Sequence, residues 1–227
     1  MTISSHQIAT IPCIHRYLLG LGVPIDIPMK DQSTALDLAV FGGHLAAVSM
    51  LAHREDATVA ASSDWRSRRN NHQCTVAHWA GMGGSVRVIA WLLRHGCRFD
   101  AVQKEGQSPL HKAAAKKNFN ALAAIAAALL LPLTAASCDG VSGETELLLD
   151  RIRAAMGGFT GGADDDALSL ALALACPAMP SAESVIGDMR QLFALRDTSG
   201  MTARDIALAQ GMHADHAAVA ILSVFDF

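Results

Sequence analysis

The chain contains the stretch Thr75-Val76-Ala77-His78, and 33 residues later it contains Ser108-Pro109-Leu110-His111. The same arrangement, with Thr or Ser first and Asp or His fourth, also occurs at Thr34-Ala35-Leu36-Asp37 and Thr202-Ala203-Arg204-Asp205. An Ala follows every copy at the same distance, at Ala39, Ala80, Ala113 and Ala207. A Thr or Ser here can accept a hydrogen bond from an unpaired backbone N–H of a first helical turn. We therefore expect each copy to open a helix.

The residues after the second copy continue the pattern. Residues 86–100 are typical of a second helix, a Gly stop at Gly96 and an outgoing turn, and Ser108 then falls where the next unit should begin. The interval of 33 residues is the ankyrin period, and the sequence resembles the ankyrin repeat. This resemblance implies an all-α fold, a solenoid of stacked antiparallel helix pairs. It also implies that His78 and His111 have a structural role, in which each ties one turn to its neighbour.

The resemblance divides the chain into one domain with six parts. Residues 14–23 have the Leu-Leu to Gly spacing of a second helix, so we expect a half-repeat cap at the N-terminus. The expected parts are the cap at 1–28, a repeat with an enlarged finger at 29–72, repeats at 73–102 and 103–131, a degenerate repeat or insert at 132–196, and a capping repeat at 197–227.

Composition narrows the function classes. The 227 residues are 51% hydrophobic and 17% charged, which favours a globular protein, and the net charge of −3 argues against nucleic-acid binding. The five cysteines are odd in number and widely spaced, which indicates a reducing compartment. The spacings Cys74 to His78 and His95 to Cys97 supply two ligands where structural zinc needs four, so we expect no metal and no cofactor.

No targeting or membrane segment stands out. The N-terminus lacks an apolar core of signal-peptide length, although residues 1–16 have a faint organelle-targeting composition. Residues 121–136 are uncharged, but this stretch is short for a bilayer and is interrupted by Pro132, so we expect a buried helix. These features predict an intracellular protein of the cytoplasm or nucleus, with an organelle not excluded.

The pattern breaks in two places. Thr34 to Thr75 is eight residues longer than the period, and the excess, around residues 64–72, predicts an enlarged finger. Its Trp65 and three arginines allow three interpretations: a solvated loop with Trp65 folded back onto the stack, a protein contact, or a grip on phosphate or RNA. The second break is the interval from Ser108 to Thr202, where residues 143–147 resemble a degenerate repeat start and Leu192-Phe193 resembles the end of an outer helix.

The ankyrin resemblance implies a concave binding face made of fingertips and inner helices. In this register, an apolar centre of Phe41, Trp79 and Met82 is flanked by lysines, which suits an acidic partner with hydrophobic anchors. The expected partner-binding residues are Lys30, Asp31, Ser33, Phe41, Trp65, Arg68, Arg69, His72, Trp79, Met82, Lys104, Glu105, Lys112 and Lys116.

The function expected from these features is a non-enzymatic adaptor or scaffold that binds a protein partner. The alternative is a structural subunit of a large multiprotein assembly. No Ser-His-Asp, Cys-His or paired-carboxylate set stands out, and no small-molecule substrate is evident.

Overall fold

The computed structural model describes residues 27–57, 64–134, 150–151, 154, 182–213 and 216–225. Most of the expected N-terminal cap and most of the 132–196 insert lie outside these residues. The described residues form helices and no strand, and none of these helices is long and apolar enough to cross a membrane. The helices are α2 (Ala35–Phe41), α3 (Leu45–Ala57), α4 (Val76–Gly83), α5 (Val86–Arg94), α6 (Pro109–Ala115), α7 (Phe119–Thr134), α10 (Ala182–Phe193), α11 (Ala203–Ala209) and α12 (Ala217–Leu222).

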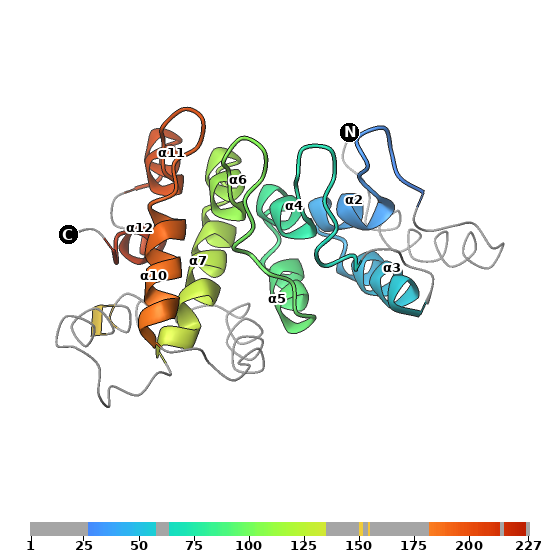
Figure 1. Cartoon of the computed structure of the whole chain (residues 1–227), viewed down its shortest axis with the longest axis horizontal. Coiled ribbons are helices and arrows are strands. Elements are labelled where there is room, and N and C mark those ends of the chain that lie inside the picture. Colours follow the sequence, from blue (N-terminus) through green and yellow to red (C-terminus); the bar gives the residue numbers. More distant parts are fainter. Residues whose placement is uncertain are drawn as a thin grey trace.

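The helices stack in two rows (Figure 1). The short helices α2, α4, α6 and α11 contact one another in that order and form the inner row. The outer row runs through α3, α5, α7 and α12, and α10 packs against α7. The described part of the chain is thus a solenoid of helix pairs, as the sequence predicts.

Each inner helix begins at one of the four tetrapeptides. In every copy the fourth side chain accepts from the backbone N–H of the first residue, and the two residues have the capping-box arrangement; in the last copy the Thr202 hydroxyl also accepts from the Asp205 backbone N–H at 3.2 Å. This capping box satisfies backbone donors that a helix start otherwise leaves unpaired. The prediction that each copy opens a helix is confirmed.

The two histidines join consecutive repeats. His78 Nδ1 accepts from the backbone N–H of Thr75 at 3.1 Å, so the ring proton lies on Nε2, which is 3.2 Å from the Gln107 carbonyl oxygen of the next repeat. His111 repeats the arrangement, with Nε2 3.1 Å from the Leu195 carbonyl oxygen. Both rings are buried. The structural role that the resemblance implied for them is confirmed.

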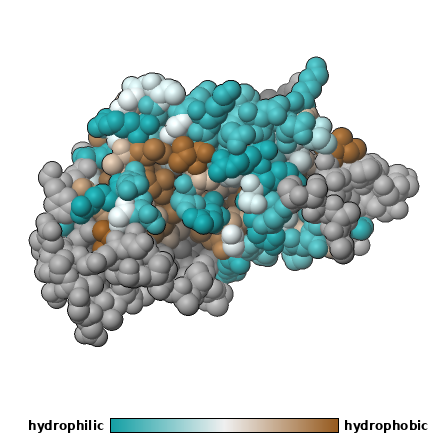
Figure 2. Space-filling model, in the orientation of Figure 1, coloured by the Kyte–Doolittle hydropathy of each residue, from teal (hydrophilic) through white to brown (hydrophobic). Residues whose placement is uncertain are grey.

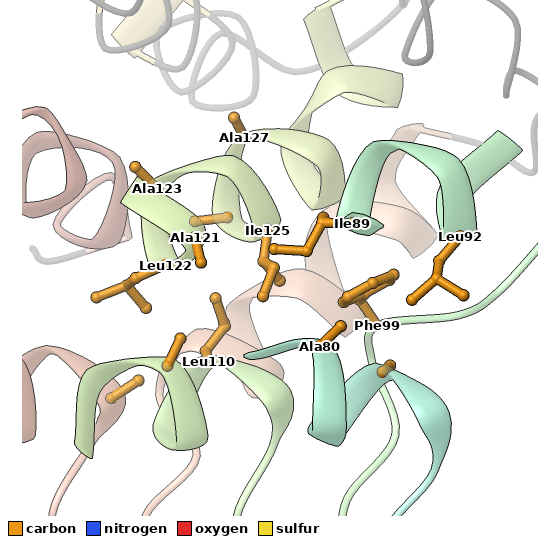
Figure 3. Close-up of a cluster of buried hydrophobic side chains, with 14 of the residues drawn as sticks. Ala80, Ile89, Leu92, Phe99, Leu110, Ala121, Leu122, Ala123, Ile125 and Ala127 are labelled. Atoms are coloured by element: carbon orange, nitrogen blue, oxygen red, sulfur yellow. The ribbon is translucent and has the colours of Figure 1, made fainter. Parts of the chain in front are cut away.

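Small and branched residues fill the space between the rows. Ile89 and Leu92 of α5, Ile125 of α7 and Leu110 of α6 are fully buried, and they point into the layer between inner and outer helices (Figure 3). Ala80 is also buried, at 1% exposure, where the inner helices meet. Alanines allow the inner helices to approach closely, while the larger side chains of the outer helices fill the core.

Glycines on α4 mark the closest approach between repeats. A Cβ on Gly83 would lie 2.4 Å from the Phe41 carbonyl oxygen of the first repeat. A Cβ on Gly81 would lie 2.5 Å from the Pro109 carbonyl oxygen of the third. Because backbone atoms cannot move aside independently, both sites exclude any side chain.

Gly83→Ala is expected to lower the free energy of unfolding by about 1–3 kcal/mol, since the added methyl group forces the first two repeats apart. The matched control is Gly187→Ala on α10, where a Cβ meets nothing within 4 Å. There alanine should raise stability by about 0.5–1 kcal/mol through helix propensity. Urea unfolding measures both, and equal effects at the two positions would contradict the close approach.

The fingertips form a second connection between repeats. Each is a four-residue turn closed by a backbone hydrogen bond, at Met29–Gln32, Asn70–Gln73, Gln103–Gly106 and Asp197–Gly200. Backbone hydrogen bonds link neighbouring fingertips at the same offset throughout: Asn71 to Asp31, Lys104 to His72, and Thr198 to Glu105. The fourth repeat is therefore in register with the third despite the long interval between them.

The second fingertip is regular, so the prediction of an enlarged finger is wrong. Its turn, Asn70–Gln73, matches the other three. The segment 64–69 instead packs against the outer row, where Trp65 stacks on Trp91 of α5 with ring centroids 6.1 Å apart. Trp65 thus adds a contact on the outer row.

The apolar pair expected at the end of the insert is confirmed. Leu192 and Phe193 end α10 and are both buried. Phe193 also meets Phe225, which follows α12, in an edge-to-face contact with centroids 5.4 Å apart. Helix α10 thereby joins the hydrophobic core before the chain enters the fourth fingertip.

Candidate functional site

The exposed side of the inner row, together with the fingertips, is the candidate site and is called the inner face below. The outer row covers the opposite side of these helices. The fourth residue after the start of each tetrapeptide is Leu38, Trp79, Lys112 or Ile206, and the seventh is Phe41, Met82, Ala115 or Ala209. Leu38 and Phe41 are among the most exposed large hydrophobic residues described, whereas Ile206 is buried.

The first two repeats form an apolar half of the inner face. Phe41 is 44% exposed and Leu38 45%, and Phe41 meets Trp79 edge to face with centroids 6.0 Å apart. Trp79 and Met82 are half-buried. The structure thus brings Phe41 and Trp79 together on neighbouring helices, as the register predicts.

The indole N–H of Trp79 finds no hydrogen-bond acceptor among the described residues. Buried polar groups are paired in most native structures, so an unpaired donor beside exposed hydrophobic rings is unusual. Ile27 and Met29, just before and at the start of the first fingertip, are also exposed. Figure 2 shows two hydrophobic areas on this face of the molecule. One lies near residue 27, where the described part of the chain begins, and the other lies where α6, α7, α10 and α11 meet. Most of the remaining described surface is hydrophilic.

The third repeat forms a basic half. Lys104 is exposed at its fingertip, Lys112 is half-buried on α6, and Lys116 is the exposed C-cap of that helix. Glu105 lies beside Lys104 and accepts a hydrogen bond from the Gln103 amide at 3.2 Å. Lys30 and His72 are exposed on the first and second fingertips. These predicted residues are therefore accessible to a partner at the inner face.

Two predicted contacts are instead internal. Ser33 is fully buried: its hydroxyl donates to Asp31 at 2.8 Å and accepts from the Asn70 amide at 3.1 Å. These bonds hold Asp31 in the fingertip and lower the pKa of its carboxyl. Trp65 is 3% exposed, and its N–H donates to Asp56 at 2.9 Å. Neither Ser33 nor Trp65 can meet a partner, and the interpretation of Trp65 as folded back onto the stack is correct.

The arginines after Trp65 also have internal partners. Arg66 lies over the Trp65 ring and pairs with Asp56 and Asp64, both at 2.9 Å. Arg68 pairs with the buried Glu55 at 2.7 Å and donates to the Thr34 hydroxyl at 2.8 Å. The Arg68 guanidinium therefore supports the first helix cap, and its contact with a partner stays a prediction.

Arg69 is exposed and contacts only backbone carbonyls, those of Gln73 and Val102, at 3.0 and 2.9 Å. It lines a cleft of about 570 Å³ with Arg66, Arg98 and Asp100. Arg98 pairs with Asp100 in this cleft. Carboxylates thus neutralise two of its three arginines, whereas the basic half of the inner face has a single glutamate.

Residues 77–124 match the family described as ankyrin repeats (many copies). These are ankyrin repeats. The match covers α4, α5 and α6 and the start of α7, and the first and fourth units share its caps and fingertip bonds. No curated protein matches the chain. Ankyrin repeats generally mediate protein–protein interaction.

One polar contact in the ankyrin repeats resembles part of a catalytic site. The Ser108 hydroxyl lies 2.9 Å from His111 Nδ1, as a nucleophile and its base do. Both residues are buried, and His111 Nε2 faces a backbone carbonyl where a catalytic triad would place a carboxylate. The contact is a helix cap, and the described residues contain no group of three potential metal ligands.

Proposed function

We propose that this chain is a non-enzymatic adaptor that binds a protein partner through the inner face of its ankyrin repeats. The observation that carries the proposal is the pair Phe41 and Trp79, exposed or half-buried and in contact on neighbouring inner helices. Aromatic side chains of this kind supply much of the binding energy in protein interfaces. Met82 and Leu38 extend the apolar surface that such an anchor needs.

The unpaired indole N–H of Trp79 supports the same function. A partner that displaces the neighbouring side chains could offer a backbone carbonyl to this donor and remove the cost of leaving it unsatisfied. The chain is further proposed to act in a reducing intracellular compartment. This agrees with Cys74 and Cys97, which are unpaired, buried thiols.

Phe41→Ala is expected to remove about 2 kcal/mol of partner affinity while leaving the fold intact, because an exposed anchor acts mainly on the complex. The test is affinity purification of the tagged chain from native cells, identification of the partner, and titration calorimetry with the purified pair. Val102→Ala, a similarly exposed position on an outgoing turn, is the control and should bind normally.

Full affinity of the Phe41→Ala variant would show that the partner does not bind at the inner face. If the chain then also remained in one large complex through purification, the second function would be favoured, a structural subunit of a multiprotein assembly.

A further inference from the structure

The lysines of this chain are concentrated in one repeat. The chain has five lysines. Four of them fall within the third ankyrin repeat: Lys104, Lys112, Lys116 and Lys117. Cationic positions elsewhere in the chain are almost all arginine. These four residues are called the lysine strip below.

Within its repeat, the strip runs from the fingertip along α6 to the turn that follows this helix. Lys104 lies at the fingertip, Lys112 on α6, and Lys116 and Lys117 in the turn that follows this helix. Lys112 and Lys116 are four positions apart, so they share one side of the helix. Three of the four side chains are exposed, and Lys112 is half-buried.

Lys117 occupies a conformation that disfavours it. Its φ is +59°, in the left-handed region, and the equivalent positions of the other repeats are Gly43, Gly84 and Gly211. A side chain disfavours this region relative to glycine, because its Cβ crowds the following carbonyl oxygen. The third repeat therefore has a lysine where its neighbours have the residue that the backbone favours.

The strip is also poorly neutralised. None of its ammonium groups forms an ion pair with a carboxylate in the described part of the chain. Glu105 is the single acid between residues 104 and 117, and Asp197 on the next fingertip is held by Gln107 and by two backbone N–H groups. Four positive charges against one negative charge leave this repeat strongly basic in a chain whose net charge is −3.

We propose that the lysine strip binds an acidic segment of the partner protein, a run of Asp and Glu next to the apolar residues that meet Phe41 and Trp79. The inference rests on the proposed function and names the chemistry of the partner. Lys117 is accepted at a strained position because it adds a fourth charge to the strip, and strained residues concentrate where they serve binding.

A protein segment fits this surface better than a nucleic acid. The basic area is one repeat wide and lies next to α4, whose half-buried Trp79 contacts the exposed Phe41 of α2, an arrangement that matches an amphipathic peptide. Nucleic-acid surfaces instead place many cations along an extended path to release counterions.

The test uses a fluorescein-labelled peptide of two leucines followed by eight glutamates, with anisotropy as the readout. Lys117→Gly should weaken binding about two- to fivefold, the range for one exposed charge, and the loss should shrink at high salt. The same variant should raise the melting temperature by about 2–4 °C as the backbone strain is relieved. Reversing Lys116 and Lys117 to Glu together should weaken binding more than tenfold, because like charges repel.

Gln73→Gly is the matched control. Gln73 also has a left-handed backbone, with φ +63°, at a fingertip. Its replacement should raise the melting temperature in the same way, which separates the relief of backbone strain from the loss of the Lys117 charge.

Three results would overturn the proposal: no salt-sensitive binding by the unmodified chain, unchanged affinity in the double reversal, or equal binding of a single-stranded oligonucleotide of the same charge through the same lysines. If Phe41→Ala weakened peptide binding and the lysine variants did not, the adaptor function would stand and the acidic partner would be rejected.

Discussion

Arg68→Glu is expected to lower the free energy of unfolding by about 3 kcal/mol or more, the loss typical of breaking a buried ion pair. Glu55 is only 6% exposed, and the Arg68 guanidinium lies 2.7 Å from its carboxylate. The substitution removes this partner, places a second carboxylate beside Glu55, and withdraws the donor that the Thr34 hydroxyl uses. Urea unfolding followed by circular dichroism measures the change.

Arg69→Glu is the control for this experiment. The two arginines are neighbours in sequence, but Arg69 is exposed and contacts backbone carbonyls alone. Its reversal should change stability by no more than about 0.5 kcal/mol. Similar losses at the two positions would show that the general charge of the segment matters, and that the pair with Glu55 does not.

Lowering the pH from 7 to 4 is expected to cost roughly 3 kcal/mol of stability through His78 alone. Burial lowers the pKa of His78 to about 4, from an ordinary value of 6.5. Between these values the unfolded chain binds a proton that the folded chain excludes. The contribution of the neutral His78 ring to the free energy of unfolding is therefore fully present above pH 6.5 and is lost as the pH falls towards 4.

Two other groups also change the stability of the fold between pH 7 and 4. Burial also lowers the pKa of His111, which adds to the loss in acid. Burial raises the pKa of Asp37, which acts in the opposite sense because the folded state holds its proton more tightly. A variant is therefore needed to isolate His78.

His78→Gln keeps a side chain that can complete a capping box, and it removes the titrating ring. Its stability should change less between pH 7 and 4 than that of the unmodified chain. An unchanged slope in His78→Gln would assign the acid sensitivity to other groups.

The features that the sequence predicts correctly depend on short intervals. A capping box joins residues three apart, so Thr75 and His78 are sufficient to place a helix start. The period then assigns Phe41 and Trp79 to equivalent sides of neighbouring helices, where the structure brings them into contact. Both predictions need only local geometry and a repeat length.

The errors concern contacts between distant residues. The repeat length predicts an enlarged finger at residues 64–72 and leaves the place of Trp65 open, because that place depends on Asp56 and Trp91, which no repeat rule pairs with it. One signal was available, since Glu55 and Asp56 precede the arginines and could neutralise them. The place of Lys117 was also readable, because it lies nine residues after Ser108, as Gly84 does after Thr75.

Hydrogen bonds between the third and fourth fingertips set the position of the last repeat, and the length of the chain between these fingertips does not. Thr198 donates to the Glu105 carbonyl and Gln107 to Asp197, so the position of the last repeat is specified by the surface on which it docks. The covalent path from α7 to α10 needs only to be long enough. Since the entropy of closing a loop grows by about 0.6 kcal/mol per doubling of its length, this interval can lengthen, shorten or diverge while the array keeps its order. The order of the repeats thus follows from surface recognition between fingertips, and the number of residues between Ser108 and Thr202 does not set it.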